Sequence, residues 1–300
     1  MRQDYRMPSP FAGFVRFVAP AVALLAAGAA IAAERTHTIV PEDYFSIAVI
    51  TGCAASPDGR LAAYTDMRWE PPAEKRNTDL WIVDIATGRP LRLTFDRANE
   101  GAPQWSPDGR FVYYTSNPQR GDEKDPPFNG KKQVWRLTGG AEPQAVTRVD
   151  GGIGLYDLSQ DGRYLYYTKG NEVVDDEFKE LREKYGDLEY GHGVTEFSQI
   201  WRLDLTTWRE EKIVDEKRVI GAFRVSPDMR RIAMLTTPDA TLLTNEGWSR
   251  VDIYDTESKT VTTLPDNLWR ENVASPYGWL DGIAWSGDSA ALALSVSWDG

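Results

Sequence analysis

Short apolar runs alternate with turn-forming residues along most of the chain after about residue 45. The stretch Ser106–Gly109 reads SPDG and is followed by Arg110 and the apolar run Phe111–Tyr114; Ser56–Gly59 repeats the same four letters. Proline presets φ for a type I turn, aspartate bonds nearby backbone N–H groups, and glycine supplies the left-handed conformation that closes a hairpin. The pattern therefore predicts a strand-to-strand turn at each SPDG.

Looser copies of this turn occur at Ser159-Gln160-Asp161-Gly162, Ser226-Pro227-Asp228 and Ser286-Gly287-Asp288. The five serines are spaced 50, 53, 67 and 60 residues apart. Repeats of this size are typical of propellers, solenoids and other arrays in which neighbouring units bury one another.

Each repeat also contains a third and a fourth apolar segment. The third carries an aromatic residue at one recurring position, Trp81, Trp135 and Trp201, which we expect to be core. The fourth follows a short turn, as in Leu91–Thr94. Four strands per repeat form a meandering blade, so the sequence predicts an all-β fold, a β-propeller with about four to five blades over residues 34–300. A β-sandwich with coincidental turns is the alternative.

Composition narrows the functional classes. The 11 Trp and 13 Tyr favour strands over helices. A formal net charge of −11 repels polyanions, which argues against a nucleic-acid partner. The single cysteine, Cys53, allows no internal disulfide and is expected to be a buried small apolar residue in a strand.

Residues 1–33 have the organisation of a signal peptide. Arg2, Arg6 and Arg16 form a positive region, an Ala/Leu/Val-rich run follows from Phe17 to Ala33, and Ala30-Ile31-Ala32 supplies small residues at a cleavage site. The apolar run is short and rich in alanine, so we expect removal rather than a stable membrane span. The predicted location is periplasmic or secreted, in a bacterium.

The repeated turn, together with "LWIVD" and "RLT" strands, resembles the blades of TolB-type propellers and of the N-terminal propeller of the prolyl oligopeptidase family. Longer stretches such as "FKELREKYGDLEYGHG", "VTEFSQIWRLDL", "LLTNEGWSRVDIYD" and "SPYGWLDGIAWS" are similar to secreted dipeptidyl-peptidase or acylaminoacyl-peptidase-like members. The resemblance implies a serine-type peptidase in which the propeller caps an α/β-hydrolase domain carrying a Ser-Asp-His triad.

No catalytic machinery occurs within these 300 residues. The chain lacks G-x-S-x-G, H-E-x-x-H, clustered cysteines, an EF-hand loop and a phosphate-binding G-x-x-x-x-G-K. Its two histidines, His37 and His192, do not follow a candidate Ser and Asp in hydrolase order. We therefore expect no catalytic residue, metal or cofactor here. The family's propellers have seven or eight blades, so we also expect a truncated chain with the hydrolase domain beyond Gly300.

Connection lengths single out the working face. Second-to-third connections are long, at 66–78, 117–132, 169–198 and 237–249, and lie opposite the short SPDG turns. Long loops on a rigid scaffold are where binding groups gather. In 169–198, the spacing of Phe178, Leu181 and Tyr185 predicts an amphipathic helix. The simplest interpretation of this helix is a solvent-exposed surface element without a binding role. The candidate substrate-binding residues are Arg68, Trp69, Glu70, Asp187, Glu189 and Glu246.

The candidate residues have distinct expected roles. In the dipeptidyl-peptidase branch an acidic pair on the propeller holds the substrate's α-ammonium, and Asp187 and Glu189 could do so here through charge-assisted hydrogen bonds. Arg68 could hold a peptide carbonyl, and Trp69 could pack a side chain or simply pack between blades.

The hypothesis is therefore a substrate-gating, N-terminus-anchoring propeller of an exported serine exopeptidase. Its partners would be a peptide substrate and its own C-terminal hydrolase domain, with a homo-oligomer left open. The alternative is a non-catalytic TolB-like periplasmic protein-binding propeller.

Overall fold

The computed structural model describes residues 38–70, 75–139, 141–174, 176–186, 194–237, 249–265, 267 and 280–296. The predicted signal peptide and three of the candidate residues, Asp187, Glu189 and Glu246, lie outside these ranges. Residues 1–41 and 42–300 form separate units, and the fold described here is that of the second unit.

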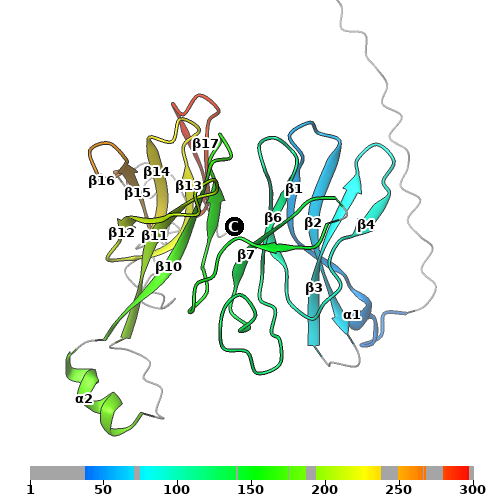
Figure 1. The fold of residues 1–300 in the computed structure, drawn as a ribbon, viewed down its shortest axis with the longest axis horizontal. Helices are drawn as coiled ribbons and strands as arrows, with labels where there is room; N and C mark the ends of the chain where they lie inside the picture. Colours follow the sequence, from blue (N-terminus) through cyan, green and yellow to red (C-terminus); the bar gives the residue numbers. More distant parts are fainter. Residues whose placement is uncertain are drawn as a thin grey trace, which may run out of the picture. The chain divides into compact units, whose positions relative to one another are not determined.

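The chain is all-β and folds into antiparallel meanders that follow one another along the sequence. Four sheets have four strands each, in the orders β1-β2-β3-β4, β5-β6-β7-β8, β9-β10-β11-β12 and β13-β14-β15-β16, and β17 and β18 form a two-stranded sheet. We call these sheets blades 1 to 5. Blades 1 and 2 lie on the right in Figure 1 and blades 3, 4 and 5 overlap on the left, and contacts between strands join blade 1 to blade 2, blade 3 to blade 4 and blade 4 to blade 5. The predicted four blades and start of a fifth are confirmed.

The bounds of the elements are as follows. The helices are α1 (Asp43–Ser46) and α2 (Asp176–Lys184), and the strands are β1 (Val49–Ala55), β2 (Leu61–Glu70), β3 (Lys75–Asp84), β4 (Pro90–Arg92), β5 (Gly101–Trp105), β6 (Val112–Ser116), β7 (Gln133–Leu137), β8 (Gln144–Ala145), β9 (Tyr156–Leu158), β10 (Tyr164–Val174), β11 (Val194–Asp204), β12 (Glu210–Asp215), β13 (Val219–Val225), β14 (Arg231–Thr237), β15 (Arg250–Asp255), β16 (Thr260–Thr263), β17 (Leu280–Trp285) and β18 (Leu292–Val296).

The SPDG turns close the first hairpin of every blade in one way. Ser106 Oγ donates to Asp108 Oδ1 at 2.6 Å and accepts from the Phe111 amide, and the same serine–aspartate bond recurs at 2.6 Å in all five turns. The fourth turn residue is left-handed throughout, as Gly109 with φ 71° or as Met229 with φ 60°. The end of the blades that carries these turns is called the turn end, and the opposite end is called the loop end.

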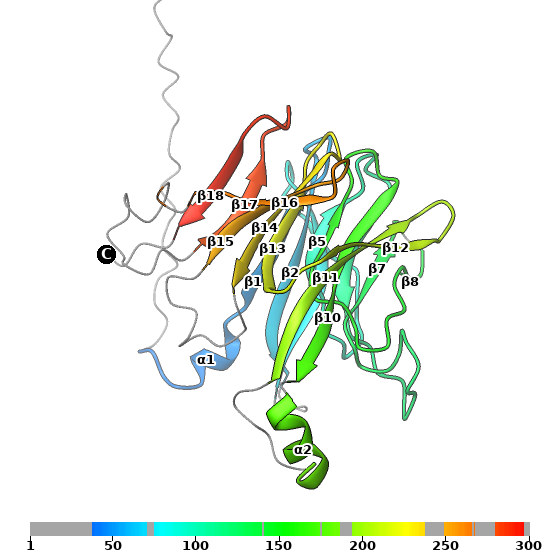
Figure 2. The same ribbon diagram turned by 90° about the vertical axis from the view of Figure 1, so that its left-hand side faces the viewer.

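Adjacent blades share apolar cores. Tyr113 and Val134 of blade 2 pack with Leu165 and Tyr167 of blade 3, and a comparable cluster joins blade 3 to blade 4 around Phe223. Figure 2 shows the next pairing, with β17 of blade 5 beside the strands of blade 4. The serial stacking buries faces that a single blade would expose, as in other repeat architectures.

Side chains of the innermost strands also join successive blades by hydrogen bonds. The indole of Trp105 in blade 2 donates to the Ala54 carbonyl oxygen of blade 1 at 3.0 Å, and that of Trp285 in blade 5 donates to the Arg224 carbonyl oxygen of blade 4 at 3.0 Å. Between blades 2 and 3 the donor is the Tyr156 hydroxyl, which bonds the Ala102 carbonyl oxygen. Each of these three donors lies in the later blade of its pair.

Two burial predictions need correction. Trp135 is buried, but Trp81 and Trp201 are only partly buried. Trp81 stacks on Tyr64 on the face of blade 1 that no described blade covers. Cys53 is exposed rather than buried, because β1 is the first strand of this same blade. For Trp81 and Cys53, exposure therefore follows from the absence of a described blade on that face. Trp201 has a blade on either side and packs against the core between blades 2 and 3, yet it is only partly buried.

The long connections are partly strand. Residues 66–70 continue β2 and pair with 75–79 of β3, and β10 and β11 remain paired out to Val174 and Val194. The predicted helix in the third connection is confirmed as α2, which lies below β10 and β11 at the loop end (Figure 1). Among the described residues, none of the helices is long and apolar enough to cross a membrane.

Candidate substrate-facing site at the loop end

Three predicted site residues, Arg68, Trp69 and Glu70, end strand β2. They face Asn77, Arg76 and Lys75 across the hairpin, so they sit on a regular strand and not in a loop as predicted. Pairing with β3 makes the site more rigid than a loop would be, since a paired strand fixes the direction of its side chains. Asp187, Glu189 and Glu246 lie outside the described residues, so their position on the face of the long connections stays a prediction.

Arg68 carries an exposed guanidinium fixed to a buried acid. Its Nη2 and Nε lie 2.8 and 3.0 Å from Asp66 Oδ2, while 62% of the Arg68 side chain is exposed. The hydrogen bond and charge of Asp66 raise the pKa of Arg68. The guanidinium is thus held at the end of the strand with most of its surface available for a polar ligand.

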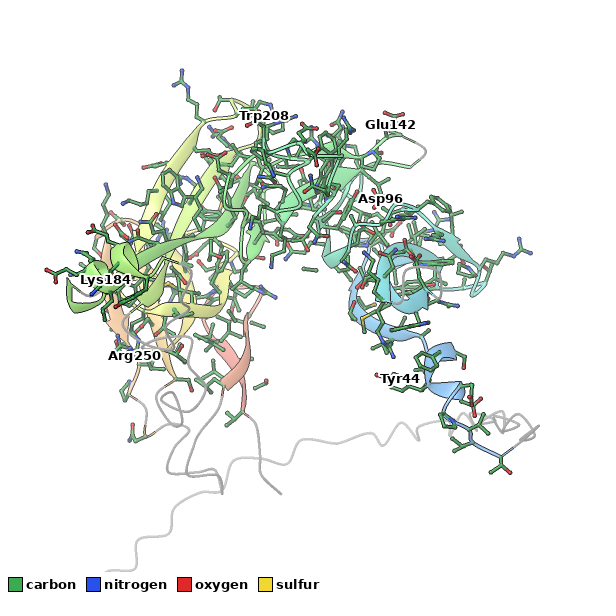
Figure 3. The ribbon with its side chains drawn as sticks, turned by 90° about the horizontal axis from the view of Figure 1, so that it is seen from below. Tyr44, Asp96, Glu142, Lys184, Trp208 and Arg250 are labelled. Carbon is green, nitrogen blue, oxygen red and sulfur yellow. The ribbon has the colours of Figure 1, made fainter. Side chains whose placement is uncertain are left out.

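Aromatic side chains from helix α1 cover the neighbouring positions of β2 and β3. The Phe45 ring lies 5.0 Å from that of Trp69, and the Arg76 guanidinium lies 5.0 Å from the centre of the Tyr44 ring. Tyr44 and Phe45 remain 59% and 47% exposed. Exposed rings that are held by contacts of this kind offer flat apolar surface at low entropic cost. We call Tyr44, Phe45 and Trp69 the aromatic cluster; Tyr44 is labelled in Figure 3.

Three buried polar atoms of the β2–β3 hairpin have no hydrogen-bond partner among the described residues: Asp66 Oδ1, Arg76 Nη1 and Asn77 Oδ1. Buried polar groups are nearly always paired, and each exception calls for an explanation. Because Asn77 faces Arg68 and Arg76 faces Trp69 across the hairpin, the two acceptors belong to the Arg68 face and the donor belongs to the face of the aromatic cluster. Sequence reasoning missed Asp66, Arg76 and Asn77, because their unpaired state depends on the register of β2 and β3.

A buried carboxyl group fixes the link between blades 1 and 2. Glu100 is 4% exposed and accepts from Thr94 Oγ1 at 2.8 Å and from Ser116 Oγ at 2.7 Å. Burial raises the pKa of Glu100 to about 8, outweighing the two hydroxyl donors, so the group is largely protonated at neutral pH. Nothing in the sequence pattern distinguishes Glu100 from an exposed loop acid. Its role is to hold the link that enters β5.

A pocket of about 500 Å³ opens at the loop end where blades 2, 3 and 4 meet. Its wall is mainly backbone from 149–155 and 219–221, with side chains of Lys132, Thr168 and Ser198. This size lies within the range of ligand sites in proteins. Across the described residues, no group of three or more His, Cys, Asp or Glu side chains is placed to hold a metal ion.

The stacked four-stranded meanders define the class of protein as a β-propeller. Residues 43–181 match the family model described as "Prolyl oligopeptidase, N-terminal beta-propeller domain". This part of the chain is therefore similar to the N-terminal propellers of the prolyl oligopeptidase family, as the blade motifs predict.

Two curated relatives are peptidases. The chain is 24% identical over 204 residues to "Uncharacterized peptidase YuxL" of Bacillus subtilis, covering 63% of this chain and 30% of the relative. It is 29% identical over 136 residues to "Dipeptidyl-peptidase 5" of Porphyromonas endodontalis, covering 45% of this chain and 18% of the relative. The chain thus spans less than a third of either relative's length.

A solved structure supports the fold alone. An oligogalacturonate lyase in complex with manganese superposes with a TM-score of 0.52 at 14% identity, covering 82% of this chain and 61% of the lyase. At this identity the similarity extends to the arrangement of blades and to no ligand or activity.

Proposed function

We propose that this propeller is the substrate-facing domain of an exported serine exopeptidase. It would admit short peptides and anchor their N-termini for a C-terminal α/β-hydrolase domain. The observation that carries the proposal is that the loop end of the β2–β3 hairpin carries unpartnered buried polar atoms, an exposed guanidinium on one face and exposed aromatic rings on the other. The family similarity of residues 43–181 and the two peptidase relatives support a peptidase-associated role.

The chemistry divides between two regions. At the end of β2, the exposed guanidinium of Arg68 would donate to a peptide carbonyl, and Trp69 with Phe45 would pack against a side chain. In the connection after α2, the carboxylates of Asp187 and Glu189 would accept from the α-ammonium, and Glu70 and Glu246 would add negative charge. Acyl transfer would be performed by a Ser-His-Asp triad with an oxyanion hole in the hydrolase domain.

The anchor is tested with the full-length gene product on paired substrates. A dipeptidyl chromogenic substrate with a free N-terminus and its N-acetylated form are compared in the Asp187→Ala/Glu189→Ala double variant. We expect KM for the free form to rise roughly tenfold or more, since a charge-assisted contact is lost, with little change for the acetylated form. Unchanged KM for the free form would exclude these residues as the anchor.

A control double variant, Glu142→Ala/Glu257→Ala, removes the same charge from exposed positions at the turn end. It should retain wild-type kinetics. If it loses activity as the anchor variant does, net charge rather than a specific contact is responsible. The TolB-like alternative makes a different prediction: the full-length protein would bind peptides or proteins but cleave neither dipeptidyl nor acylaminoacyl substrates.

A further inference from the structure

A second pocket, of about 590 Å³, lies between blades 1 and 2 at the loop end. One wall is the link between the blades, with Asp96 and Arg97, and the other is the β6–β7 connection, with Arg120 and Phe128. Lys75, at the start of β3, completes the rim. Figure 3 views this end of the molecule and labels Asp96.

The pocket gathers positive charge in an acidic protein. Lys75, Arg97 and Arg120 line it against a single carboxylate, that of Asp96, although the whole chain has a net charge of −11. The side-chain nitrogens of these three cations form no hydrogen bond or ion pair with the described residues. Six arginines elsewhere in the described part of the chain form ion pairs with acids, as Arg92 does with Asp79 at 2.8 Å. Three unpaired cations in one concave site favour a ligand that carries negative charge.

The link wall is built on rigid backbone. Asn77 Nδ2 donates to the Asp96 carbonyl oxygen at 3.1 Å, and Asp96 Oδ1 accepts from the Ala98 amide at 2.9 Å. Glu100 anchors the end of the link through Thr94 and Ser116. These bonds hold the backbone on both sides of Arg97, so this wall loses little conformational entropy when a ligand binds.

The opposite wall is equally fixed. The Arg120 amide donates to the Phe128 carbonyl oxygen and the Gly130 amide donates to the Pro118 carbonyl oxygen, each at 3.0 Å. The Arg120 guanidinium lies 3.7 Å from the centre of the Phe128 ring, a cation–π contact that leaves its N–H groups for a ligand. The ring adds an apolar patch next to the charges.

From this geometry we propose that the pocket binds an acidic peptide segment, through carboxylates on Arg97, Arg120 and Lys75. Guanidinium groups pair with carboxylates through parallel N–H bonds. The amide side chains of Asn99 and Asn117, which also line the pocket, suit a peptide backbone. The volume is many times that of one small ion, and it accommodates several residues. The proposal requires neither a hydrolase domain nor cleavage, so it is independent of the proposed peptidase role.

The test is fluorescence anisotropy with a labelled hexapeptide that contains two adjacent glutamates, compared with its glutamine counterpart at low ionic strength. We expect the glutamate peptide to bind the protein at least about tenfold more tightly, and this preference to fall as salt is added. Equal affinity for the two peptides would overturn the proposal.

Variants locate the site. Arg97→Gln/Arg120→Gln should remove the preference for glutamate. Asp96→Asn keeps the acceptor for the Ala98 amide and removes the only negative charge of the pocket, so affinity should rise about two- to fivefold. The control Arg60→Gln/Arg230→Gln makes the same charge change with exposed turn-end residues and should keep the preference. An equal loss in the control would mean that binding is non-specific. Circular dichroism checks that each variant is folded.

Competition separates carboxylate from phosphate chemistry. Glutarate should displace the labelled peptide at lower concentration than inorganic phosphate does. If phosphate at the same concentration displaces the peptide as well or better, the pocket is a phosphate site and the acidic-peptide proposal is wrong.

Discussion

The turn end and the loop end of the blades carry acidic residues in opposite electrostatic states. At the turn end, hydrogen bonds from neighbouring serines, threonines and backbone amides lower the pKa of the aspartates Asp58, Asp84, Asp108, Asp204, Asp228, Asp255 and Asp288. At the loop end, burial raises the pKa of Glu100 and Glu216. Two acids depart from this pattern. Lys212 and Gln199 lower the pKa of Asp215, and burial raises the pKa of Asp157, two residues before the turn at Ser159, to about 6.

The contrast in pKa follows from the origin of the contacts: hydrogen bonds within a turn at the turn end, and packing between distant segments at the loop end. The carboxylate of each turn-end aspartate except Asp204 bonds within three residues of itself, so the stabilisation is largely local and repeats with the sequence. Asp204 also accepts from the Arg163 guanidinium at 2.9 Å. Glu100 instead joins segments 6 and 16 residues away and depends on the packing of two blades. Pockets occur at both ends, since one of about 750 Å³ is lined by the turns of blades 2 and 3. The unpartnered buried atoms of the β2–β3 hairpin and the group of unpaired cations lie at the loop end, and for that reason the candidate binding features are assigned to it.

The largest expected effect concerns Glu100. Its folded pKa of about 8 lies above the unfolded value near 4.5, so the folded state binds the extra proton between these pH values. Its contribution to the free energy of unfolding is therefore present below pH 4.5 and is lost as pH rises through 8, by on the order of 3–5 kcal/mol. Glu100→Gln should match the wild type near pH 4.5 and exceed it in stability at pH 8.

Urea unfolding at several pH values measures this difference, with exposed Glu142→Gln as the control that should follow the wild type throughout. A variant whose stability keeps a constant offset from the wild type across this range would show that Glu100 titrates normally. Glu100, in the link between blades 1 and 2, would then be ionised at neutral pH as the turn-end aspartates are.

The next effect concerns the turns. Ser106→Ala removes the donor to Asp108 Oδ1 and the acceptor of the Phe111 amide, so we expect a loss of about 2 kcal/mol in the free energy of unfolding. Ser46→Ala, in exposed α1 at the loop end, removes one solvent-facing hydroxyl and should cost under about 0.5 kcal/mol. Equal losses in the two variants would show that the buried turn serine contributes no more to the free energy of unfolding than an exposed hydroxyl at the loop end.

The smallest effect tests backbone strain in a third-to-fourth turn. Lys259 is exposed and has a left-handed φ of 57°, where the equivalent residue of blade 1 is Gly88. Lys259→Gly relieves the clash of Cβ with the backbone, which outweighs the added entropy of the unfolded chain by up to about 0.5 kcal/mol. Lys259→Ala keeps the Cβ and should bring no gain in thermal unfolding. A gain with alanine alone would exclude strain as the cause.

The sequence predicts the blades because their signals are local. Ser106, Asp108 and Gly109 act within one turn, and β6 follows directly from the β-branched and aromatic residues of Val112–Ser116, all of which are buried. The extension of β2 through Arg68 to Glu70 was missed because polar residues there resemble a loop. Their strand conformation comes from pairing with β3, which is a tertiary contact.

The candidate site is less accessible to such reasoning. Arg68 and Trp69 stand out as a charged and an aromatic residue beside a long connection, and the structure places both at the loop end. No pattern in the sequence around Asn77 and Arg76 indicates a binding site. Their unpartnered atoms, like the raised pKa of Glu100, result from burial by segments distant in the chain.

Three of the hydrogen bonds between innermost strands relate the blades to the order of synthesis. The donors Trp105, Tyr156 and Trp285 are each encoded after the acceptor that they satisfy, whereas the weaker bond from Gln104 to the Tyr156 carbonyl oxygen, at 3.4 Å, runs the other way. During synthesis from the N-terminus, blades 1, 2 and 4 each leave the ribosome with a carbonyl group that a side chain of the following blade later covers. Assembly of the array is thereby coupled to the order of translation, and a pause within a blade prolongs the exposure of the blade before it.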